Sequence, residues 1–201
     1  LHTEPELEFY SMHRMCDDLR PEYDDEIIEK WIEGETGFPF LDACMKFLNE
    51  NGWINFRMRA MIMSFASYNL WQPWQKTSPR LAELFTDYEP GIHISQVQMQ
   101  SGVTGINLPR IYSIAKQSMD QDPDAVWTKN LLPQLKDFDP KLIHNAELNA
   151  SYIPQIVDLK TSAKFARDQV WGIRKSIEFK NEARKVYLKH GSRRKRYTKT
   201  S

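Results

Sequence analysis

The chain has 201 residues, of which 41% are hydrophobic and 12% aromatic, and its 27 Lys and Arg balance 27 Asp and Glu. This length and apolar content suit about one domain with a real core, and the zero net charge excludes a chain that binds polyanions with its whole surface. The two cysteines, Cys16 and Cys44, are too few for a four-thiolate zinc or iron–sulfur site, and we expect free thiols.

No apolar run approaches the roughly 18 residues of a membrane span, and no signal peptide is recognisable. We therefore expect a cytoplasmic protein with no membrane partner. Because the first residue is Leu, we also expect a piece of a longer protein.

Charge is unevenly placed along the chain. Residues 1–33 carry eleven acids against three Lys and Arg, whereas residues 160–201 carry fourteen Lys and Arg against three acids. The acidic start and the basic end are expected to dock on one another, or else the basic end meets phosphate. His13 has Asp17 four residues on, but two ligands fall short of a metal site, so His13 is expected on the solvated surface.

Helical patterns dominate the first half of the chain. Acids in a first turn predict a helix over 24–32, the sequence GETGFP predicts a turn, and apolar residues at i, i+3, i+4 and i+7 from Leu41 predict a helix that stops at Asn51-Gly52. A third helix is expected from about 55 to 71, ended by Pro73, and a fourth over 78–88.

The second half contains one ambiguous segment. Residues 92–100 (IHISQVQMQ) alternate apolar and polar, which is typical of a strand, although nothing nearby offers a partner strand. Further helices are expected over 110–119 and 124–132, and a linker over 157–162. From 163 onward the pattern predicts one long basic helix with a single apolar face, and the end, GSRRKRYTKTS, is expected to be disordered.

Several motifs occur in order and carry a resemblance. They are WIEGETGFPFLDACM (31–45), NGWINFRMRAMIMSF (51–65), LWQPW (70–74), PRIYSIAKQ (109–117) and, more weakly, LLPQL (131–135). This set resembles the C-terminal helical FAD-binding domain of the photolyase/cryptochrome family, in which the last motif has Trp and Glu in place of Leu131 and Gln134.

The resemblance implies an all-α fold of the photolyase/cryptochrome type, of which this chain holds the distal part only. Residues 1–157 would form the distal part of the FAD-binding domain, 158–190 a basic helix packed on it or extending from it, and 191–201 a disordered basic tail. The family's antenna domain and the proximal part of its FAD domain would lie upstream in the same protein. The implied cofactor is FAD, of which the fragment alone would hold only part.

The resemblance also implies residues around the flavin. Arg59 would pair with Asp87 beside the flavin and tune its redox state, whereas without the resemblance the pair would be an ordinary salt bridge between helices. Glu89 stands where the family has an Asp at the ring edge, His93 stands near flavin N5, and Phe56 replaces an Asn near the flavin and the lesion.

The family passes electrons to its flavin along a chain of tryptophans. Trp74 matches the middle position of this chain, but the proximal position is Val97, which cannot relay an electron. Trp71 or Tyr68 could substitute for it. Alternatively, Trp71 and Trp74 are anchors of the core or of an interface.

For damaged DNA, the resemblance implies contacts around the flavin cavity. Arg57 and Arg110 match positions on the family's DNA-binding face, and Gln98 and Met99 would lie at the cavity rim, where Met99 replaces a Trp. The RRKR run of the tail is either a phosphate tether or a solvated tail. No metal site is expected.

Three functions remain open from the sequence. The first is an enzyme, a deoxyribodipyrimidine photolyase (a carbon–carbon lyase) that uses light to transfer an electron from reduced FAD to pyrimidine dimers. The second is a cryptochrome-like blue-light flavoprotein without DNA repair, which Phe56, Val97 and Met99 favour. The third is a helical interaction module that has lost its flavin.

Overall fold

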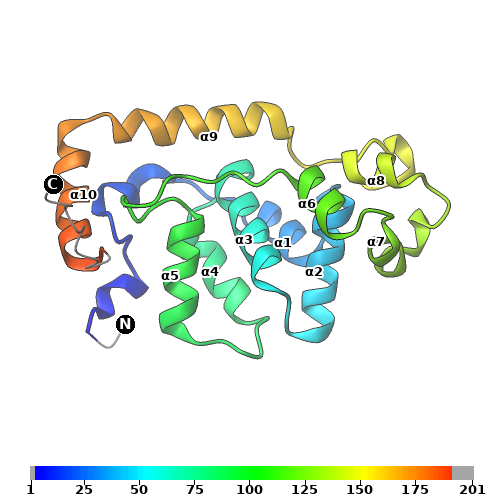
Figure 1. The fold of residues 1–201 in the computed structure, drawn as a ribbon, viewed down its shortest axis with the longest axis horizontal. Coiled ribbons are helices and arrows are strands. Elements are labelled where there is room, and N and C mark those ends of the chain that lie inside the picture. Colours follow the sequence, from blue (N-terminus) through cyan, green and yellow to red (C-terminus); the bar gives the residue numbers. More distant parts are fainter. Residues whose placement is uncertain (1–2, 192–201) are drawn as a thin grey trace, which may run out of the picture.

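The computed structural model describes residues 3–191, which are helical and contain no strand, as the sequence predicted (Figure 1). Short 3₁₀ turns lie at η1 (Pro5–Glu8), η2 (Arg14–Leu19), η4 (Pro133–Leu135) and η5 (Asn149–Ser151), and η3 (Phe65–Asn69) is a π-helical turn. The α-helices are α1 (Asp25–Glu33), α2 (Pro39–Asn51), α3 (Phe56–Ser64), α4 (Trp74–Ala82), α5 (Pro90–Gln100), α6 (Ile114–Gln121), α7 (Val126–Leu131), α8 (Pro140–Asn145), α9 (Leu159–Arg174) and α10 (Ile177–His190).

Helices α1 to α5 enclose the main core. The apolar stripe of α2 is fully buried, with Leu41, Cys44, Met45 and Leu48 all out of contact with solvent, as their helical spacing predicted. α2 packs on α1 and α3, and α5 packs on α3 and α4. Burial of such side chains, at about 25 cal/mol per Å² of apolar surface, is the main force holding these helices together.

A buried carboxylate fixes the turn between α1 and α2. Asp42 accepts hydrogen bonds from the backbone N–H groups of Thr36 (2.8 Å) and Gly37 (3.0 Å) and from the hydroxyl of Tyr152 (2.9 Å). Gly34 and Gly37 both have positive φ, which a residue with a Cβ adopts only at a cost. The GETG sequence therefore forms a tight turn that also ties residues 36–42 to Tyr152, over a hundred residues later.

The segment 92–100, whose alternation is typical of a strand, belongs to helix α5. Pro90 occupies the first turn, and the Glu89 carboxylate caps the helix by accepting from Ile92 N–H at 2.6 Å. The third expected helix also differs, since α3 ends at Ser64 and continues as the π-helical turn η3. The fourth begins earlier than expected, at Trp74 instead of residue 78, and ends at Ala82.

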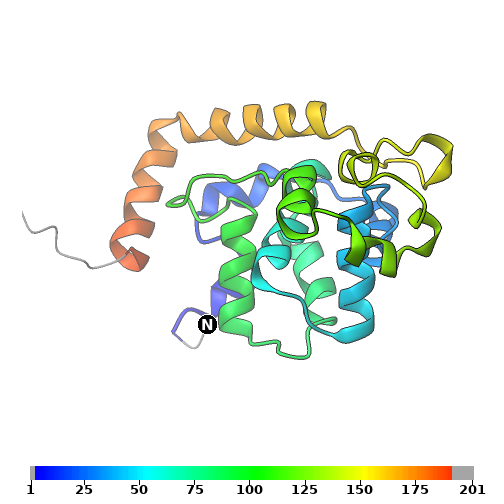
Figure 2. The same ribbon diagram turned by 45° about the vertical axis from the view of Figure 1, so that its right-hand side comes forward.

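The single long helix expected after residue 163 is in fact two helices. α9 begins at Leu159, inside the expected linker, with the Asp158 carboxylate accepting from Thr161 N–H at 2.7 Å. The chain turns after Arg174, and Ser176 caps α10 by accepting from Phe179 N–H at 3.0 Å. Figures 1 and 2 show α9 lying along one edge of the molecule and α10 turning from it back toward the N-terminal segment.

The two ends of the described chain dock on one another. Lys189 on α10 forms an ion pair with Glu4 at 2.5 Å, which agrees with the opposite charges of the two ends. His13 was expected on the surface, and this is wrong: its side chain is fully buried and stacks on Phe179. The RRKR run and the rest of the tail from residue 192 lie outside the described residues.

Two further findings concern sites that the sequence addressed. Cys16 and Cys44 are both free and buried. Among residues 3–191 there is no group of three or more His, Cys, Asp or Glu side chains that could hold a metal ion, and no helix in this part of the chain is long and apolar enough to cross a membrane.

Candidate cofactor site

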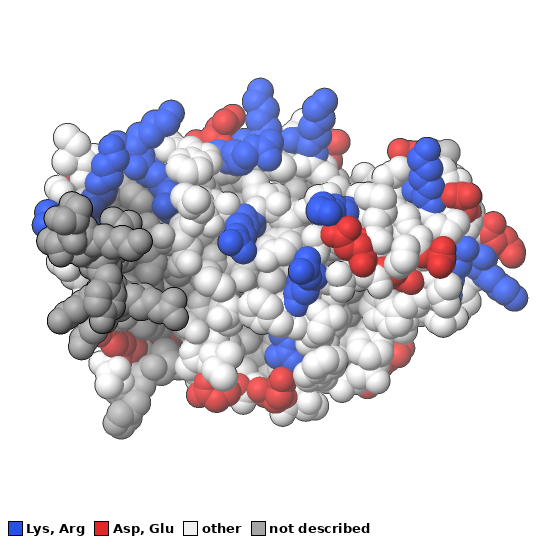
Figure 3. Space-filling view, in the orientation of Figure 1, with Lys and Arg blue, Asp and Glu red and all other residues white. Residues whose placement is uncertain are grey.

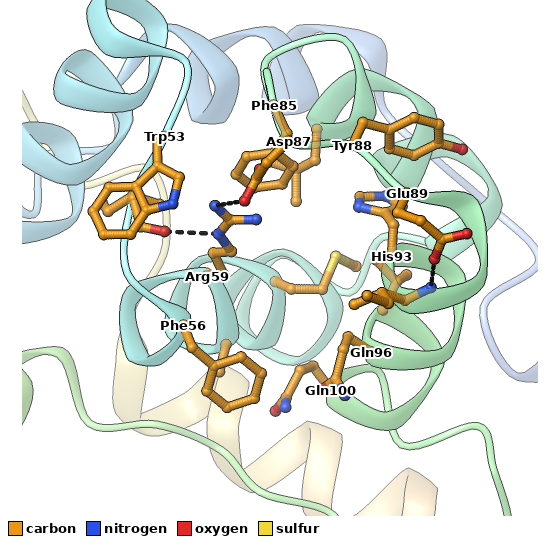
Figure 4. A pocket seen from close by; sticks show the side chains of 16 residues that line it. Trp53, Phe56, Arg59, Phe85, Asp87, Tyr88, Glu89, His93, Gln96 and Gln100 are labelled. Carbon is orange, nitrogen blue, oxygen red and sulfur yellow. Dashed lines mark hydrogen bonds and ion pairs between the residues drawn. The ribbon is translucent and has the colours of Figure 1, made fainter.

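A half-open cavity of about 470 Å³ lies between α3, the loop before α5, and α5 itself (Figure 4). This volume is within the range of small-molecule pockets, about 300–1,000 Å³. Its walls are largely apolar, and its polar groups come from a few side chains that converge on it. The apolar wall consists mainly of Ile54, Ala60, Met63, Leu81, Phe85 and Val97.

An ion pair lies at one end of this pocket. Arg59 on α3 donates from Nη2 to Asp87 at 2.9 Å and from Nε to the carbonyl of Ile54 at 2.7 Å, and its guanidinium lies 4.2 Å from the centre of the Phe85 ring. The hydrogen bond from Arg59 lowers the pKa of Asp87. Because the Asp87 side chain is 48% exposed, the pair contributes little to stability. The two hydrogen bonds nevertheless fix the position of the Arg59 guanidinium and its positive charge.

His93 on α5 lies in the pocket wall behind this pair. Its Nε2 is 3.0 Å from the hydroxyl and 3.1 Å from the carbonyl oxygen of Ser78. The hydroxyl can donate or accept, whereas the carbonyl only accepts, so the carbonyl contact is a hydrogen bond in the tautomer that carries the proton on Nε2 and leaves Nδ1 as an acceptor. Tyr88 and Phe85 meet the ring edge to face, with centroids 5.2 and 5.9 Å away. Burial lowers the pKa of His93, with the nearby Arg59 acting in the same direction. The neutral imidazole is therefore favoured.

Two other predicted residues lie at the edge of the pocket. Glu89 lines it, but one carboxylate oxygen is engaged in capping α5. Phe56, at the start of α3, also lines it and is 59% exposed. Figure 4 shows Phe56 on the opposite side of the cavity from Tyr88. The structure thus brings Arg59, Asp87, Glu89, His93 and Phe56 around one cavity. Their binding of a cofactor stays a prediction.

Gln96 and Gln100 also line the pocket, and the sequence interpretation missed both. They lie one turn apart on α5 (Figure 4). The Gln96 Oε1 atom is buried and has no hydrogen-bond partner among residues 3–191. Their spacing of four residues would have placed them on one face of a helix, but the alternating pattern of this segment indicated a strand.

Gln98 and Met99 do not line the pocket. Gln98 is buried and anchors the N-terminal segment: its Oε1 accepts from Met12 N–H at 2.6 Å, and its Nε2 donates to the carbonyls of Leu7 (2.8 Å) and Tyr10 (3.0 Å). The prediction that Gln98 lies at the cavity rim is therefore wrong. The helical path of α5 explains this, since Gln98 points about 180° away from a face centred between Gln96 and Gln100.

The two arginines predicted to contact DNA also lie outside the pocket lining. Arg57 is exposed, with Nη1 3.4 Å from the Gln117 side-chain oxygen. Arg110 is exposed, and its carbonyl accepts a hydrogen bond from the Ser64 hydroxyl at 3.0 Å. Their contact with DNA stays a prediction.

Trp74 and Trp71 lie away from the pocket lining as well. Trp74 is buried and donates from Nε1 to the Ser11 hydroxyl at 3.0 Å. Trp71 has a φ of 57° and lies between Phe165, at 5.1 Å between ring centres, and the guanidinium of Arg20, at 4.4 Å. Val97, the residue at the proximal relay position, lines the pocket and is apolar. The electron relay stays a prediction.

Known proteins resemble this chain in sequence. The family described as "FAD binding domain of DNA photolyase" matches residues 1–172. A cryptochrome DASH of Gloeobacter violaceus is 29% identical over 169 residues, which cover 77% of this chain and 34% of the relative. A chloroplastic/mitochondrial cryptochrome DASH of Oryza sativa subsp. japonica is 33% identical over 140 residues, covering 68% of this chain and 23% of the relative.

A solved photolyase structure resembles this chain in its fold. The crystal structure of an archaeal photolyase from Sulfolobus tokodaii with two FAD molecules superposes with a TM-score of 0.79 at 26% identity, over 85% of this chain and 40% of that chain. The chain spans about a third or less of the length of the two cryptochromes and 40% of the archaeal photolyase. It belongs to the photolyase/cryptochrome family, and its matched residues are those of the FAD-binding domain.

Proposed function

We propose that this chain supplies the distal wall of the FAD site in a photolyase-like protein that uses light to transfer an electron from reduced FAD to pyrimidine dimers in DNA. The observation that carries this proposal is the ion pair of Arg59 and Asp87 at the polar end of an otherwise apolar pocket. FAD, the cofactor of the family, supplies the one-electron chemistry.

The pocket residues fit a flat, polarizable ring with polar edges. Ile54, Met63 and Val97 offer apolar contact, and a methionine thioether packs well against an aromatic surface. The buried Gln96 oxygen lacks a protein donor and could accept a hydrogen bond from a ligand N–H. Apolar walls with one unsatisfied acceptor fit a flavin ring, which has apolar faces and an N–H group at its edge.

Each polar residue then has a separate role. Arg59 is held by the Ile54 carbonyl and by Asp87, so its positive charge is already in place before a ligand binds. A fixed positive charge beside a redox-active ring stabilises the ring when it gains negative charge, and so raises its reduction potential. His93, neutral and with Nδ1 free to accept, can take a hydrogen bond or a proton at that atom.

A second candidate is a blue-light flavoprotein without DNA repair. Two pocket residues favour it. Phe56 offers no hydrogen bond where photolyases have an Asn beside the lesion, and Val97 replaces an aromatic electron relay. Met99, which replaces the family's rim Trp, does not line the pocket.

The test uses the full-length protein purified in the dark. We expect an oxidised-flavin absorption band that bleaches under blue light, followed by light-dependent repair of an oligonucleotide that contains a pyrimidine dimer. Bleaching without repair would support the second candidate. A colourless protein would contradict both and leave an interaction module without flavin.

A matched pair of variants tests the role of Arg59 in that experiment. Arg59→Ala should lower FAD retention or shift its potential to more negative values, and Arg59→Lys should keep part of the effect. The control is Arg80→Ala, because Arg80 forms a comparable half-exposed ion pair with Glu29 but does not line the pocket. Equal FAD retention and equal potential in Arg59→Ala and Arg80→Ala would contradict the proposed role.

A further inference from the structure

The outward face of α9 carries a regular line of side chains, which we call the α9 stripe: Lys160, Lys164, Arg167, Trp171 and Lys175. Their intervals of three and four residues place them on one face of the helix. All five side chains are exposed, including the indole of Trp171 at 44%. The opposite face, with Ala166 and Val170, is buried against the body of the domain.

The cations of the stripe have no acidic partners. None of the four forms an ion pair or a side-chain hydrogen bond within the part of the chain that the structure describes. Asp168 is the one acid in the sequence of α9. Figure 3 shows Lys and Arg side chains projecting along the edge of the molecule that α9 forms, with few acidic atoms among them. The stripe is therefore a line of mainly positive charge without direct ion pairs among the described residues, and the Asp158 carboxylate that caps α9 lies near Lys160.

The length of the line indicates the kind of anion that it fits. From Lys160 to Lys175 the helix rises about 22 Å, at about 1.5 Å per residue. A small anion would be held by cations that converge on one point. Cations spread along a line of this length match a chain of phosphates instead.

Trp171 adds a second kind of contact in the middle of the stripe. An exposed indole between cations offers a π-face on which an unpaired base can stack, and such stacking tolerates any base sequence. In a duplex the bases are already stacked on one another and must be unpaired before they can stack on a side chain, so this contact favours a single strand.

A small cavity lies next to Trp171 and supports an inserted base. It has a volume of about 210 Å³ and is lined by Trp171 and Arg167 together with Pro109, Ile111 and Tyr68. Tyr68 is 1% exposed, and its hydroxyl lies near the backbone N–H of Arg110 without a well-formed hydrogen bond. Burial raises the pKa of Tyr68 to about 12, so the hydroxyl keeps its proton. A buried polar group without a well-formed hydrogen bond is rare in folded proteins, and the side chain of Tyr68 lines this cavity.

We propose that the α9 stripe binds single-stranded nucleic acid, with phosphates along its cations and one unstacked base against Trp171, at the cavity that reaches Tyr68. This surface is separate from the flavin site, because no residue of the stripe lines that pocket. α9 packs on η3, whereas the flavin pocket lies between α3 and α5. The proposal therefore stands whether or not the chain binds FAD.

The first test measures binding of undamaged oligonucleotides to the full-length protein by fluorescence anisotropy over a range of salt concentrations. We compare Lys160→Ala/Lys164→Ala with a matched control, Lys136→Ala/Lys141→Ala, whose lysines are also exposed and free of ion pairs among the described residues. Each phosphate contact to a single strand contributes about 0.7 to the slope of log K against log salt. The stripe variant should reduce that slope by about 1.4, and the control should leave it unchanged.

The second test concerns the base. Trp171→Ala should weaken binding of a single strand by about fivefold to a hundredfold, and Trp171→Phe should retain most of the affinity. Tyr68→Phe should weaken binding less, because it removes one hydroxyl. Binding of the single strand should also quench the tryptophan fluorescence of the wild type more than that of Trp171→Phe, which lacks this indole. DNA and RNA single strands share phosphates and unpaired bases, so parallel titrations of the two decide which one binds more tightly.

Several outcomes would overturn the proposal. One is an equal loss of affinity in the Lys136→Ala/Lys141→Ala control, and another is duplex binding as tight as single-strand binding with no effect of Trp171→Ala. Arg80→Ala, at a residue outside both the stripe and the flavin pocket, should leave this binding unchanged. A protein that binds the single strand but no flavin would contradict the proposed function alone, and a photoreducible flavoprotein indifferent to the stripe variants would contradict this inference alone. Thermal unfolding of every variant shows whether it is folded.

Discussion

His13 and Phe179 stack face to face, with ring centres 3.8 Å apart and ring planes 20° from parallel. His13 precedes η2, and Phe179 lies in the first turn of α10, so the contact joins segments 166 residues apart. His13 Nε2 is also 3.0 Å from the Phe179 carbonyl. Since a carbonyl only accepts, this ring nitrogen is the donor. The stack is the buried centre of the contact between α10 and the N-terminal segment.

Replacement of Phe179 by Ala should release α10 from the N-terminal segment. The change removes a buried ring, and Phe→Ala in a core costs about 3–5 kcal/mol. We expect amide hydrogen exchange over 177–190 to accelerate far more than exchange in α2. Phe165→Ala, on the half-exposed face of α9, is the control. Unchanged protection of α10 in Phe179→Ala would show that other contacts, such as Lys189 with Glu4, hold the helix.

Replacement of His93 by Asn should flatten the dependence of stability on pH. Burial lowers the pKa of His93 below its ordinary value of 6.5, so the folded protein binds this proton less readily than the unfolded chain. The stability that neutral His93 allows is complete above pH 6.5 and is lost as pH falls toward and through the lowered pKa. The melting temperature of the wild type should drop more steeply between about pH 7 and pH 5 than that of His93→Asn. Parallel curves would contradict the prediction.

Replacement of Asp42 by Asn should destabilise the domain strongly. The amide group offers one acceptor oxygen where the carboxylate offers two, so a backbone N–H of Thr36 or Gly37 loses its partner in a buried turn. A buried donor without a partner costs about 1–3 kcal/mol. Tyr152→Phe, which removes a single hydrogen bond to Asp42, should cost less, about 0.5–1.5 kcal/mol. Urea unfolding of the two variants measures both values, and the reverse order would contradict this reading of the turn.

Replacement of Gln98 by Leu should loosen the N-terminal segment. The variant removes the partners of Met12 N–H and of the Leu7 and Tyr10 carbonyls at once. We expect faster proteolytic cleavage between residues 7 and 13, with the pocket residues unaffected. The control is Gln169→Leu, on the exposed face of α9. Equal cleavage rates in Gln98→Leu and in the wild type would mean that the segment is held elsewhere.

The local elements were predictable where the side-chain pattern has a single cause. The apolar stripe of α2 serves only the core, so its period of 3.6 residues is clear in the sequence. α5 serves three surfaces, since Ile94 meets the core, Gln96 the pocket and Gln98 the N-terminal segment. Polar residues of α5 therefore face both the pocket and the N-terminal segment, and the sequence of α5 alternates between apolar and polar residues.

Long-range contacts set the limit of prediction elsewhere. The apolar spacing from Ile173 to Ile177 continues smoothly, so the break between α9 and α10 depends on the Ser176 cap and on docking against His13. Nothing near His13 in the sequence indicates that Phe179 will cover it. Within the site, the pairing of Arg59 with Asp87 was predicted from the family resemblance alone. The two residues are 28 positions apart on different elements, and such a spacing does not indicate that they are in contact.

The π-helical turn η3 gives the chain one residue more than an α-helix would use between α3 and α4. Its signature is the bond from Leu70 N–H to the Phe65 carbonyl at 3.0 Å. Asn69 then donates to the Ser162 hydroxyl on α9 at 3.0 Å. Deletion of one residue from 65–69 would restore an α-helical turn and rotate the later side chains of this turn by about 100°, which turns Asn69 away from Ser162. The seating of α9 therefore depends on the number of residues in this turn as well as on their identity, and related chains that lack the extra residue must seat their last helices by other contacts.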